Sequence, residues 1–319
     1  MGFHNILITS AGKRVALTRY FKETLSKYYP SAKVFTTEMN PAMAPAGYVS
    51  DECFKVPCVT DETYLDRLID ICIENKVGMI IPTIDTELLI LAKSKGLFRE
   101  KGIDVIVGDE TFISICRDKR NTGVFFAQRD IRVPKEIDKL NPSFPLFAKP
   151  YDGSLSANLH YIKSKDELIS EILNDSKLLF MEYIDKSVYK EYTIDMFYGK
   201  DNKVKSIVPR ERIEIRAGEI NKGRTAKNYI VSYLRDRLNY IEGCIGCICV
   251  QLFFNSETND IVGIEINPRF GGGYPLTYMA GANYPELLIT EYFIGEDIDY
   301  TEGWVDGKVM LRYDDAIFI

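Results

Sequence analysis

The stretch Ile264-Glu265-Ile266-Asn267-Pro268-Arg269, together with Val250-Gln251-Leu252-Phe253-Phe254 before it, decides the fold that we expect of this chain. Both runs are mostly apolar, and the polar turn Glu257-Thr258-Asn259-Asp260 lies between them. Two such runs on either side of a polar turn are typical of paired antiparallel strands. We therefore expect strands over residues 247–255 and 261–267, lying side by side.

The polar side chains of these strands form a set of oxygen ligands. Glu265 and Asn267 are two residues apart and so point to the same face of their strand, and Gln251 can lie beside them on the paired strand. A carboxylate with amide oxygens suits Mg²⁺, which binds through few carboxylates and through substrate phosphates. Arg269 adds a permanent cation for phosphate or carboxylate. On these residues alone, an exposed strand end with solvated polar groups is an equally good interpretation.

The first part of the chain alternates short apolar runs with helical runs. Such alternation with short links predicts an α/β domain, a parallel sheet covered by helices on both faces. The expected strands are residues 5–9, 33–37, 78–82 and 104–108. The expected helices are residues 15–28, 60–75 and 87–95.

The pattern changes after about residue 134, where longer alternating strands are joined by hairpin-like links. This predicts antiparallel α+β structure. The further strands expected there are residues 146–149, 158–162, 178–184, 190–198 and 203–212. One helix, over residues 165–173, interrupts them.

Composition and charge exclude several classes of protein. The chain has 319 residues and a formal net charge of -6, from 40 basic and 46 acidic residues, so we expect no nucleic-acid partner. No apolar run approaches the ~20 residues needed to cross a bilayer. The beginning of the sequence lacks the basic and apolar segments of a signal peptide. We expect a cytoplasmic protein without a membrane partner.

Three of the seven cysteines cluster at Cys244, Cys247 and Cys249. A structural zinc site needs four ligands, and no second Cys or Cys/His pair lies nearby. The run from Cys247 is instead typical of a buried strand in which cysteine serves as a small apolar residue. With only two histidines, a histidine-based metal or triad site is also not expected.

Two more segments carry residues that suit a nucleotide. Lys149 ends an apolar strand, and the turn Gly153-Ser154-Leu155-Ser156 that follows offers N–H groups and hydroxyls to phosphate. Glu182 lies near the end of one strand and Glu191 near the beginning of the next, where each can accept bonds from a nucleoside. Singly, these are also ordinary hairpin turns and strand edges.

The order of these residues along the chain resembles the ATP-grasp superfamily, and most nearly a single ATP-grasp module of the carbamoyl phosphate synthetase large subunit. The resemblance rests on Tyr189-Lys190-Glu191-Tyr192 and on the two stretches quoted first, and it covers nearly the whole chain. It implies a pre-ATP-grasp α/β domain over residues 1–115. It further implies an ATP-grasp small lobe over residues 116–185 and a large lobe over residues 186–319.

The resemblance also implies an ATP site made of Lys119, Lys149, Gly153, Ser154, Ser156, Glu182, Tyr183, Ile184 and Glu191. The two lysines would contact the phosphates, and the Gly/Ser loop would close over them. Residues 182–184 would meet the adenine, and Glu191 would hold the ribose. One or two Mg²⁺ (or Mn²⁺) ions would be bound by Gln251, Glu265 and Asn267, with Arg269 facing the transferred phosphoryl group.

Enzymes of this kind phosphorylate a carboxylate with ATP, and an amine then displaces the phosphate. Because one ATP-grasp module fills the sequence, we expect a stand-alone carboxylate–amine ligase acting through an acyl phosphate, with release of ADP and phosphate. Its partners would be small-molecule carboxylate and amine substrates, and a homodimer is compatible with the sequence. The alternative is a non-catalytic ATP-binding regulatory protein on the same fold. A dinucleotide-dependent dehydrogenase is disfavoured by the missing glycine fingerprint.

Two other charged segments are candidates for substrate contact. Arg210 and Arg212 share a face of their expected strand, and we place both near the γ-phosphate or an acidic substrate. A solvated hairpin is the equal alternative.

In an ATP-grasp protein the loop after the first strand faces the substrate side, so the resemblance makes Lys13 and Arg14 candidates for a substrate carboxylate. Asp85 and Glu87 lie at the carboxyl end of another strand, where α/β sites gather. They are candidates for an amino group, although capping of the following helix is the better-favoured interpretation.

Overall fold

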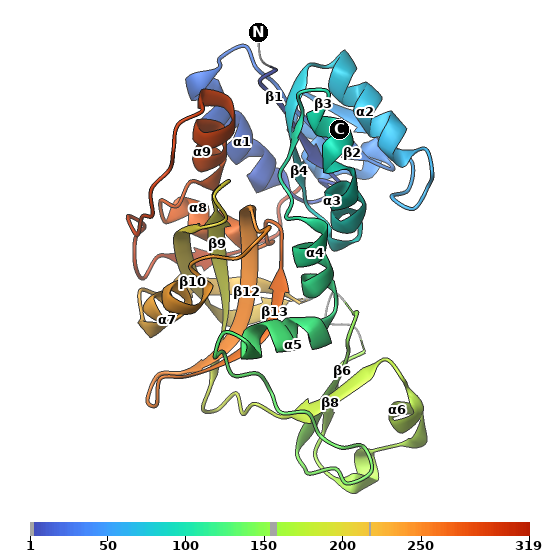
Figure 1. Cartoon of the computed structure of the whole chain (residues 1–319), viewed down its shortest axis with the longest axis vertical. Coiled ribbons are helices and arrows are strands. Elements are labelled where there is room, and N and C mark those ends of the chain that lie inside the picture. Colours follow the sequence, from blue (N-terminus) through green and yellow to red (C-terminus); the bar gives the residue numbers. More distant parts are fainter. Residues whose placement is uncertain (1–2, 154–157, 217) are drawn as a thin grey trace.

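The computed structural model describes residues 3–153, 158–216 and 218–319 (Figure 1). It confirms the expected fold class, an α/β parallel-sheet domain followed by an α+β region in two parts. Among the described residues, none of the helices has the length and apolar character that a bilayer crossing requires.

The N-terminal domain is a five-stranded parallel sheet. Its order is β3-β2-β1-β4-β5, with β1 at Asn5–Thr9, β2 at Val34–Glu38, β3 at Glu52–Lys55, β4 at Val77–Pro82 and β5 at Asp104–Val105. The connecting helices are α1 (Val15–Tyr28), α2 (Tyr64–Glu74) and α3 (Asp85–Arg99). The side chains of β1 from Ile6 to Ile8 are fully buried, as expected where both faces of a parallel sheet are covered.

A small three-stranded antiparallel sheet, in the order β7-β6-β8, has its own apolar core. It contains β6 (Leu146–Pro150), β7 (His160–Ile162) and β8 (Leu178–Glu182), and it lies at the lower end of the molecule in Figure 1. The helices α4 (Glu110–Arg117) and α5 (Lys119–Ala127) precede it. The helix expected over residues 165–173 is corrected to a 3₁₀ turn at Lys165–Glu167 and a short α6 at Ser170–Asn174, because Leu168 leaves the helical conformation.

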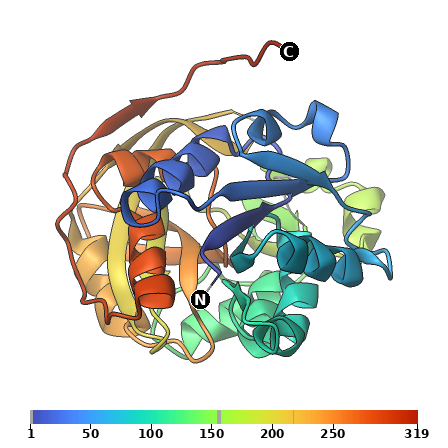
Figure 2. The same cartoon turned by 90° about the horizontal axis from the view of Figure 1, so that it is seen from above.

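The third sheet is antiparallel, with the order β13-β12-β9-β10-β11-β14. Its strands are β9 (Lys190–Tyr198), β10 (Val204–Arg216), β11 (Glu219–Thr225), β12 (Gly246–Asn255), β13 (Asp260–Asn267) and β14 (Val309–Leu311). The helices α7 (Tyr229–Leu238), α8 (Tyr274–Met279) and α9 (Tyr284–Ile289) pack with this region. In Figure 2 the blue α1 lies against the red and orange helices, and α1 contacts both α8 and α9.

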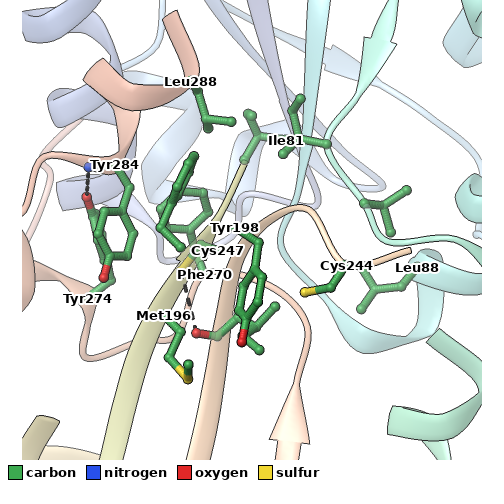
Figure 3. Packing of buried hydrophobic residues seen from close by; sticks show 14 of the residues in the cluster. Ile81, Leu88, Met196, Tyr198, Cys244, Cys247, Phe270, Tyr274, Tyr284 and Leu288 are labelled. Carbon is green, nitrogen blue, oxygen red and sulfur yellow. Dashed lines mark hydrogen bonds between the residues drawn. The ribbon is translucent and has the colours of Figure 1, made fainter. Parts of the chain in front are cut away.

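One apolar core joins the parallel sheet to the six-stranded sheet. In Figure 3, Ile81 and Leu88 from the N-terminal domain lie near Tyr198 of β9, with Cys244 among them. Cys244, Cys247 and Cys249 are all buried, which confirms their expected role as small core residues. The two domains therefore share a core, which fixes the edge of the parallel sheet against the ends of β12 and β13.

The turn before β12 makes a testable prediction about the fold. Gly243 has a positive φ of 72°, and a Cβ there would come within 2.1 Å of the Asp109 carboxylate, which caps α4. We expect Gly243→Ala to lower the free energy of unfolding by at least about 2 kcal/mol. The matched control is Gly96→Ala in α3, where a Cβ meets nothing within 4 Å. This substitution should raise the free energy of unfolding by about 1 kcal/mol. Equal effects in urea unfolding would contradict this description of the turn.

Candidate active site

The centre of the candidate site is the pairing of β12 with β13. Gln251 lies opposite Glu265, and Cys249 lies opposite Asn267, with a register shift between Gln251 and Leu252. The Asn267 amide donates to Glu265 Oε1 at 3.0 Å, so these two side chains share a face, as expected. The strand pairing thus brings one carboxylate and two amides to one end of the sheet.

Two lysines from other elements lie near the Glu265 carboxylate. Lys119, the first residue of α5, has its Nζ 3.7 Å from Glu265 Oε2, and it also donates to the carbonyl of Gly153 at 2.6 Å. Lys149 of β6 is only 8% exposed. Burial lowers the pKa of Lys149 to about 8, with the Glu265 charge opposing this shift and the Lys119 charge adding to it.

Gly153 is therefore held at the site through its carbonyl. Ser154 and Ser156, the expected phosphate-closing residues, lie outside the described residues. The Lys119 main-chain N–H donates to the Tyr151 carbonyl at 2.9 Å, which ties the beginning of α5 to the same turn.

Arg212 of β10 links two residues that sequence reasoning assigned to different ligands. Its Nη1 lies 3.2 Å from Glu191 Oε1 and donates to Gln251 Oε1 at 3.2 Å. The side chain of Arg212 is 6% exposed, so this junction is largely buried. Arg212 thus brings together Glu191, which we expect at the ribose, and Gln251, which we expect at the metal.

The expected adenine segment, at the end of β8, is bound by Arg132, which no sequence pattern singles out. Arg132 Nη2 donates to Glu182 Oε1 at 2.6 Å, and its Nη1 donates to Asp260 Oδ2 at 2.6 Å. The ring of Tyr183 lies 4.3 Å from that of Tyr161, and Ile184 is buried. Arg132 therefore ties the small sheet to the beginning of β13.

Arg269 makes a double contact with the N-terminal domain. Its Nε and Nη2 donate to the two carboxylate oxygens of Asp85 at 2.9 and 2.6 Å. Burial is the largest single influence on the pKa of Arg269 and lowers it. The charge of Asp85 and its hydrogen bonds act in the opposite direction and outweigh burial, so the pKa is raised. Asp85 therefore fixes the guanidinium direction rather than capping α3.

Glu87 is the residue that caps the beginning of α3. It is fully buried, and its carboxylate accepts bonds from the N–H groups of Thr83 and Ile84 at 2.8 and 3.2 Å and from Ser10 Oγ at 2.9 Å. Burial raises the pKa of Glu87, and these hydrogen bonds oppose the rise. The capping interpretation is therefore the right one for Glu87, whose oxygens are occupied.

Arg210 is enclosed in the sheet and closed off from solvent. Its guanidinium is 1% exposed, and its Nε and Nη2 donate to the Asp195 oxygens at 2.8 and 2.7 Å. A Cβ on Gly273 would come within 2.0 Å of its Nη1, so the arginine lies directly under the glycine turn. The expected contact of Arg210 with a phosphate is thus corrected, because in this structure its charge already faces Asp195.

The ligand set at the middle of β12 and the end of β13 fits a divalent cation of the magnesium type. It offers one carboxylate, Glu265, with the amide oxygen of Asn267 and that of Gln251, which already accepts a hydrogen bond from Arg212. Oxygen donors of this kind suit Mg²⁺ when phosphates complete the shell. Among residues 3–153, 158–216 and 218–319, no three His, Cys, Asp or Glu side chains form a metal-binding group. A zinc site of that kind is therefore not found there.

The buried lysine makes a prediction about stability and pH. Since the unfolded chain holds the Lys149 proton more tightly than the folded chain, the ammonium form opposes folding below pH 8. That cost disappears as the pH rises from about 8 towards 10.5, the ordinary pKa of lysine. We expect Lys149→Met to raise the free energy of unfolding at pH 7, without nucleotide, by up to about 3 kcal/mol.

Urea unfolding at pH 7 and pH 10 measures this effect. The stabilisation should shrink at the higher pH, and Lys165→Met, at an exposed lysine, should have no effect at either pH. A Lys149→Met protein no more stable than the parent at pH 7 would contradict the buried charge.

The Asp195–Arg210 pair makes a second prediction. Asp195→Asn leaves the buried Arg210 cation without its carboxylate, which costs about 3–5 kcal/mol. Asp314→Asn is the control, because Asp314 pairs with Arg216 in solvent and should leave the unfolding midpoint unchanged. Similar midpoints for the two variants would show that Arg210 is not held as described.

Two family models match separate parts of the chain. The model of the PylC-like N-terminal domain matches residues 6–106. The model described as ATP-grasp in the biosynthetic pathway with Ter operon matches residues 174–307. No curated protein matches the chain in sequence.

Solved structures similar to the chain share its fold at low sequence identity. N5-carboxyaminoimidazole synthetase from Staphylococcus aureus, complexed with ADP, has a TM-score of 0.71 and 17% identity, over 94% of this chain and 80% of that one. L-amino acid ligase from Bacillus licheniformis has a TM-score of 0.69 and 18% identity, over 95% and 77%.

The biotin carboxylase domain of the Hydrogenobacter thermophilus 2-oxoglutarate carboxylase, with MgADP, has a TM-score of 0.71 and 16% identity, over 96% and 73%. Together, the two family models and the shared fold bear out the resemblance found in the sequence. Residues 174–307 thus match an ATP-grasp family model, and the whole chain has the fold of these ATP-grasp structures.

Proposed function

We propose that this protein is an ATP-dependent ligase that joins a carboxylate to an amine through an acyl phosphate, releasing ADP and phosphate. The observation that carries the proposal is the convergence of Lys119, Lys149 and the Glu265–Asn267 pair, which come from three separate elements. Cations and an oxygen-ligand set in one half-buried place match the charge of a nucleoside triphosphate with its metal. The similar solved structures, an L-amino acid ligase among them, support it.

The proposed roles follow from the charges. Lys119 and Lys149 bind phosphate oxygens, and Glu191 binds the ribose beside Arg212. Glu182, Tyr183 and Ile184 line the adenine, and Ser154 and Ser156 close over the phosphates. Gln251, Glu265 and Asn267 hold Mg²⁺, which when bound neutralises charge on the phosphate oxygens.

The reaction proceeds in two steps. A carboxylate oxygen of the first substrate attacks the γ-phosphorus, and the bond from that phosphorus to the ADP oxygen breaks. The amine nitrogen then attacks the acyl carbon, the carbon–oxygen bond to phosphate breaks, and the nitrogen loses a proton. Lys149 and Arg269 stabilise the negative charge that spreads over the transferred oxygens.

Arg210 has a different role in this proposal. Because it is enclosed and paired with Asp195, it positions the glycine turn after Arg269 and touches no substrate. We further propose domain boundaries after residues 115 and 185 and a cytoplasmic protein; a homodimer is compatible with the sequence.

A screen of ADP release tests the proposal. With paired carboxylates and amines, we expect release only when both substrates are present. Glu265→Gln and Lys149→Met should each lower the rate at least about 100-fold, because each removes a charge that acts on the phosphates.

The matched control is Glu257→Gln, in the exposed turn of the same β12–β13 hairpin, which should keep the parental rate. ATP binding without substrate-dependent ADP release from any pair would contradict the ligase and favour a non-catalytic ATP-binding regulator. Full activity in Glu265→Gln would contradict the assignment of the site.

A further inference from the structure

A cavity of about 310 Å³ lies at the seam between the N-terminal domain and the six-stranded sheet. The N-terminal domain lines it with the end of α3, with β5 and with the residue that caps α4. The β9–β10 turn, the turn before β12 and Tyr292 line it from the other side. Its volume is at the lower end of the range for small-molecule sites. None of the described residues that we assign to nucleotide, metal or phosphoryl transfer lines this cavity, so it is separate from the ligase site.

Charged residues of both signs line the cavity. Lys95 and Arg99 come from α3 and Lys200 from the β9–β10 turn, whereas Asp104 begins β5 and Asp109 precedes α4. Within the described part of the chain, none of these three cations forms an ion pair with either of the two acids. The cavity therefore holds opposite charges apart, and its three cations exceed its two acids by one positive charge.

The Asp104 carboxylate lacks a partner in this seam. It is partly buried, and no residue in the described ranges donates a hydrogen bond to it. Burial raises the pKa of Asp104, although the charges of Lys200, Arg99 and Lys95 oppose the rise. A partly buried carboxylate without a donor is costly unless a ligand supplies one. The group that best meets this need is a positively charged donor such as an ammonium group.

The cations keep hydrogen-bond donors for an anion. Lys95 Nζ and Lys200 Nζ each donate to one main-chain carbonyl, at 2.8 and 2.9 Å, and so retain further N–H groups for a ligand. Arg99 is exposed, and no side chain or carbonyl of residues 3–153, 158–216 and 218–319 accepts a bond from its guanidinium. The dipole of α3 favours cations at its end. It does not account for the acid Asp104 among them.

Much of the remaining cavity wall is apolar. Ile103 and Val105 are buried residues that line it, and Ile245 and Tyr292 are partly buried. A ligand that satisfies this cavity therefore carries an anionic group, a cationic donor and an apolar portion close together. An α-amino acid has all three on one carbon atom.

We propose that this cavity binds an α-amino acid with an apolar side chain, at a site distinct from the ligase site. The carboxylate of the amino acid contacts Arg99 and Lys95, and its ammonium group contacts Asp104. Its side chain lies against Ile245 and Tyr292. The inference goes beyond the proposed ligase and does not rest on it, because the two sites share no residue.

Calorimetric titration of the full chain, without nucleotide, tests the proposal. The probes are L-valine, L-leucine, L-isoleucine and L-phenylalanine, each compared with its amide and with the acid that lacks its amino group. We expect at least one amino acid to bind at least about tenfold more tightly than both of its analogues. Arg99→Gln and Asp104→Asn should each weaken this binding at least about tenfold, because each removes one of the two charges that the zwitterion needs.

The matched controls are Lys101→Gln and Glu100→Gln. Both residues are exposed, follow Arg99 directly in the chain and do not line the cavity, so these variants should bind the amino acid as the wild type does. Urea unfolding of each variant shows whether it is folded. Because Arg99 is exposed, Arg99→Gln should fold normally, and it keeps the test decisive if Asp104→Asn weakens the fold.

Three results would overturn the inference. The first is that none of the four amino acids binds the wild type, and the second is binding that both variants retain, which places the amino acid elsewhere. The third is binding lost in Arg99→Gln but unchanged in Asp104→Asn, which indicates a site for anions alone. Binding that needs both residues, without ADP release from any substrate pair, would refute the ligase and leave this inference standing.

Discussion

The candidate site depends on the attraction between the Glu265 carboxylate and two lysines. The carboxylate lies 3.7 Å from Lys119 of α5 and attracts Lys149 of β6, so one carboxylate of β13 holds two cations from other elements. The lysines repel each other, and burial makes the Lys149 charge costly. Buried charges of like sign that lower the stability of the fold are typical of a functional site. A bound triphosphate would supply the negative charge that neutralises these two lysines.

The N-terminal domain contributes more than a scaffold. Its core is continuous with that of the six-stranded sheet, and Asp85 reaches across to fix the Arg269 guanidinium. The carboxyl edge of the parallel sheet therefore faces the ends of β12 and β13 in a defined arrangement. In our proposal, the nucleotide and the metal lie on the β13 side of Arg269.

The sequence predicted the parts of the site that depend on local pattern. The strand period placed Glu265 and Asn267 on one face, and the α/β alternation predicted the parallel sheet. The ion-pair partners could not be predicted in this way, because Asp85 and Arg269 are 184 residues apart and no period relates them. The same applies to Arg210, since its burial follows from Asp195 on the neighbouring strand. The helices α4, α5 and α7 to α9 were missed because they are short, between six and ten residues, so that few turns are available to show a helical period.

The most direct test of the central claim is the affinity for ATP with and without Mg²⁺, in the wild type and in Glu265→Gln. If Glu265 and its neighbours hold the metal that bridges to the phosphates, Mg²⁺ should tighten ATP binding to the wild type at least about tenfold and have little effect in the variant. Equal tightening by Mg²⁺ in both proteins would contradict the account.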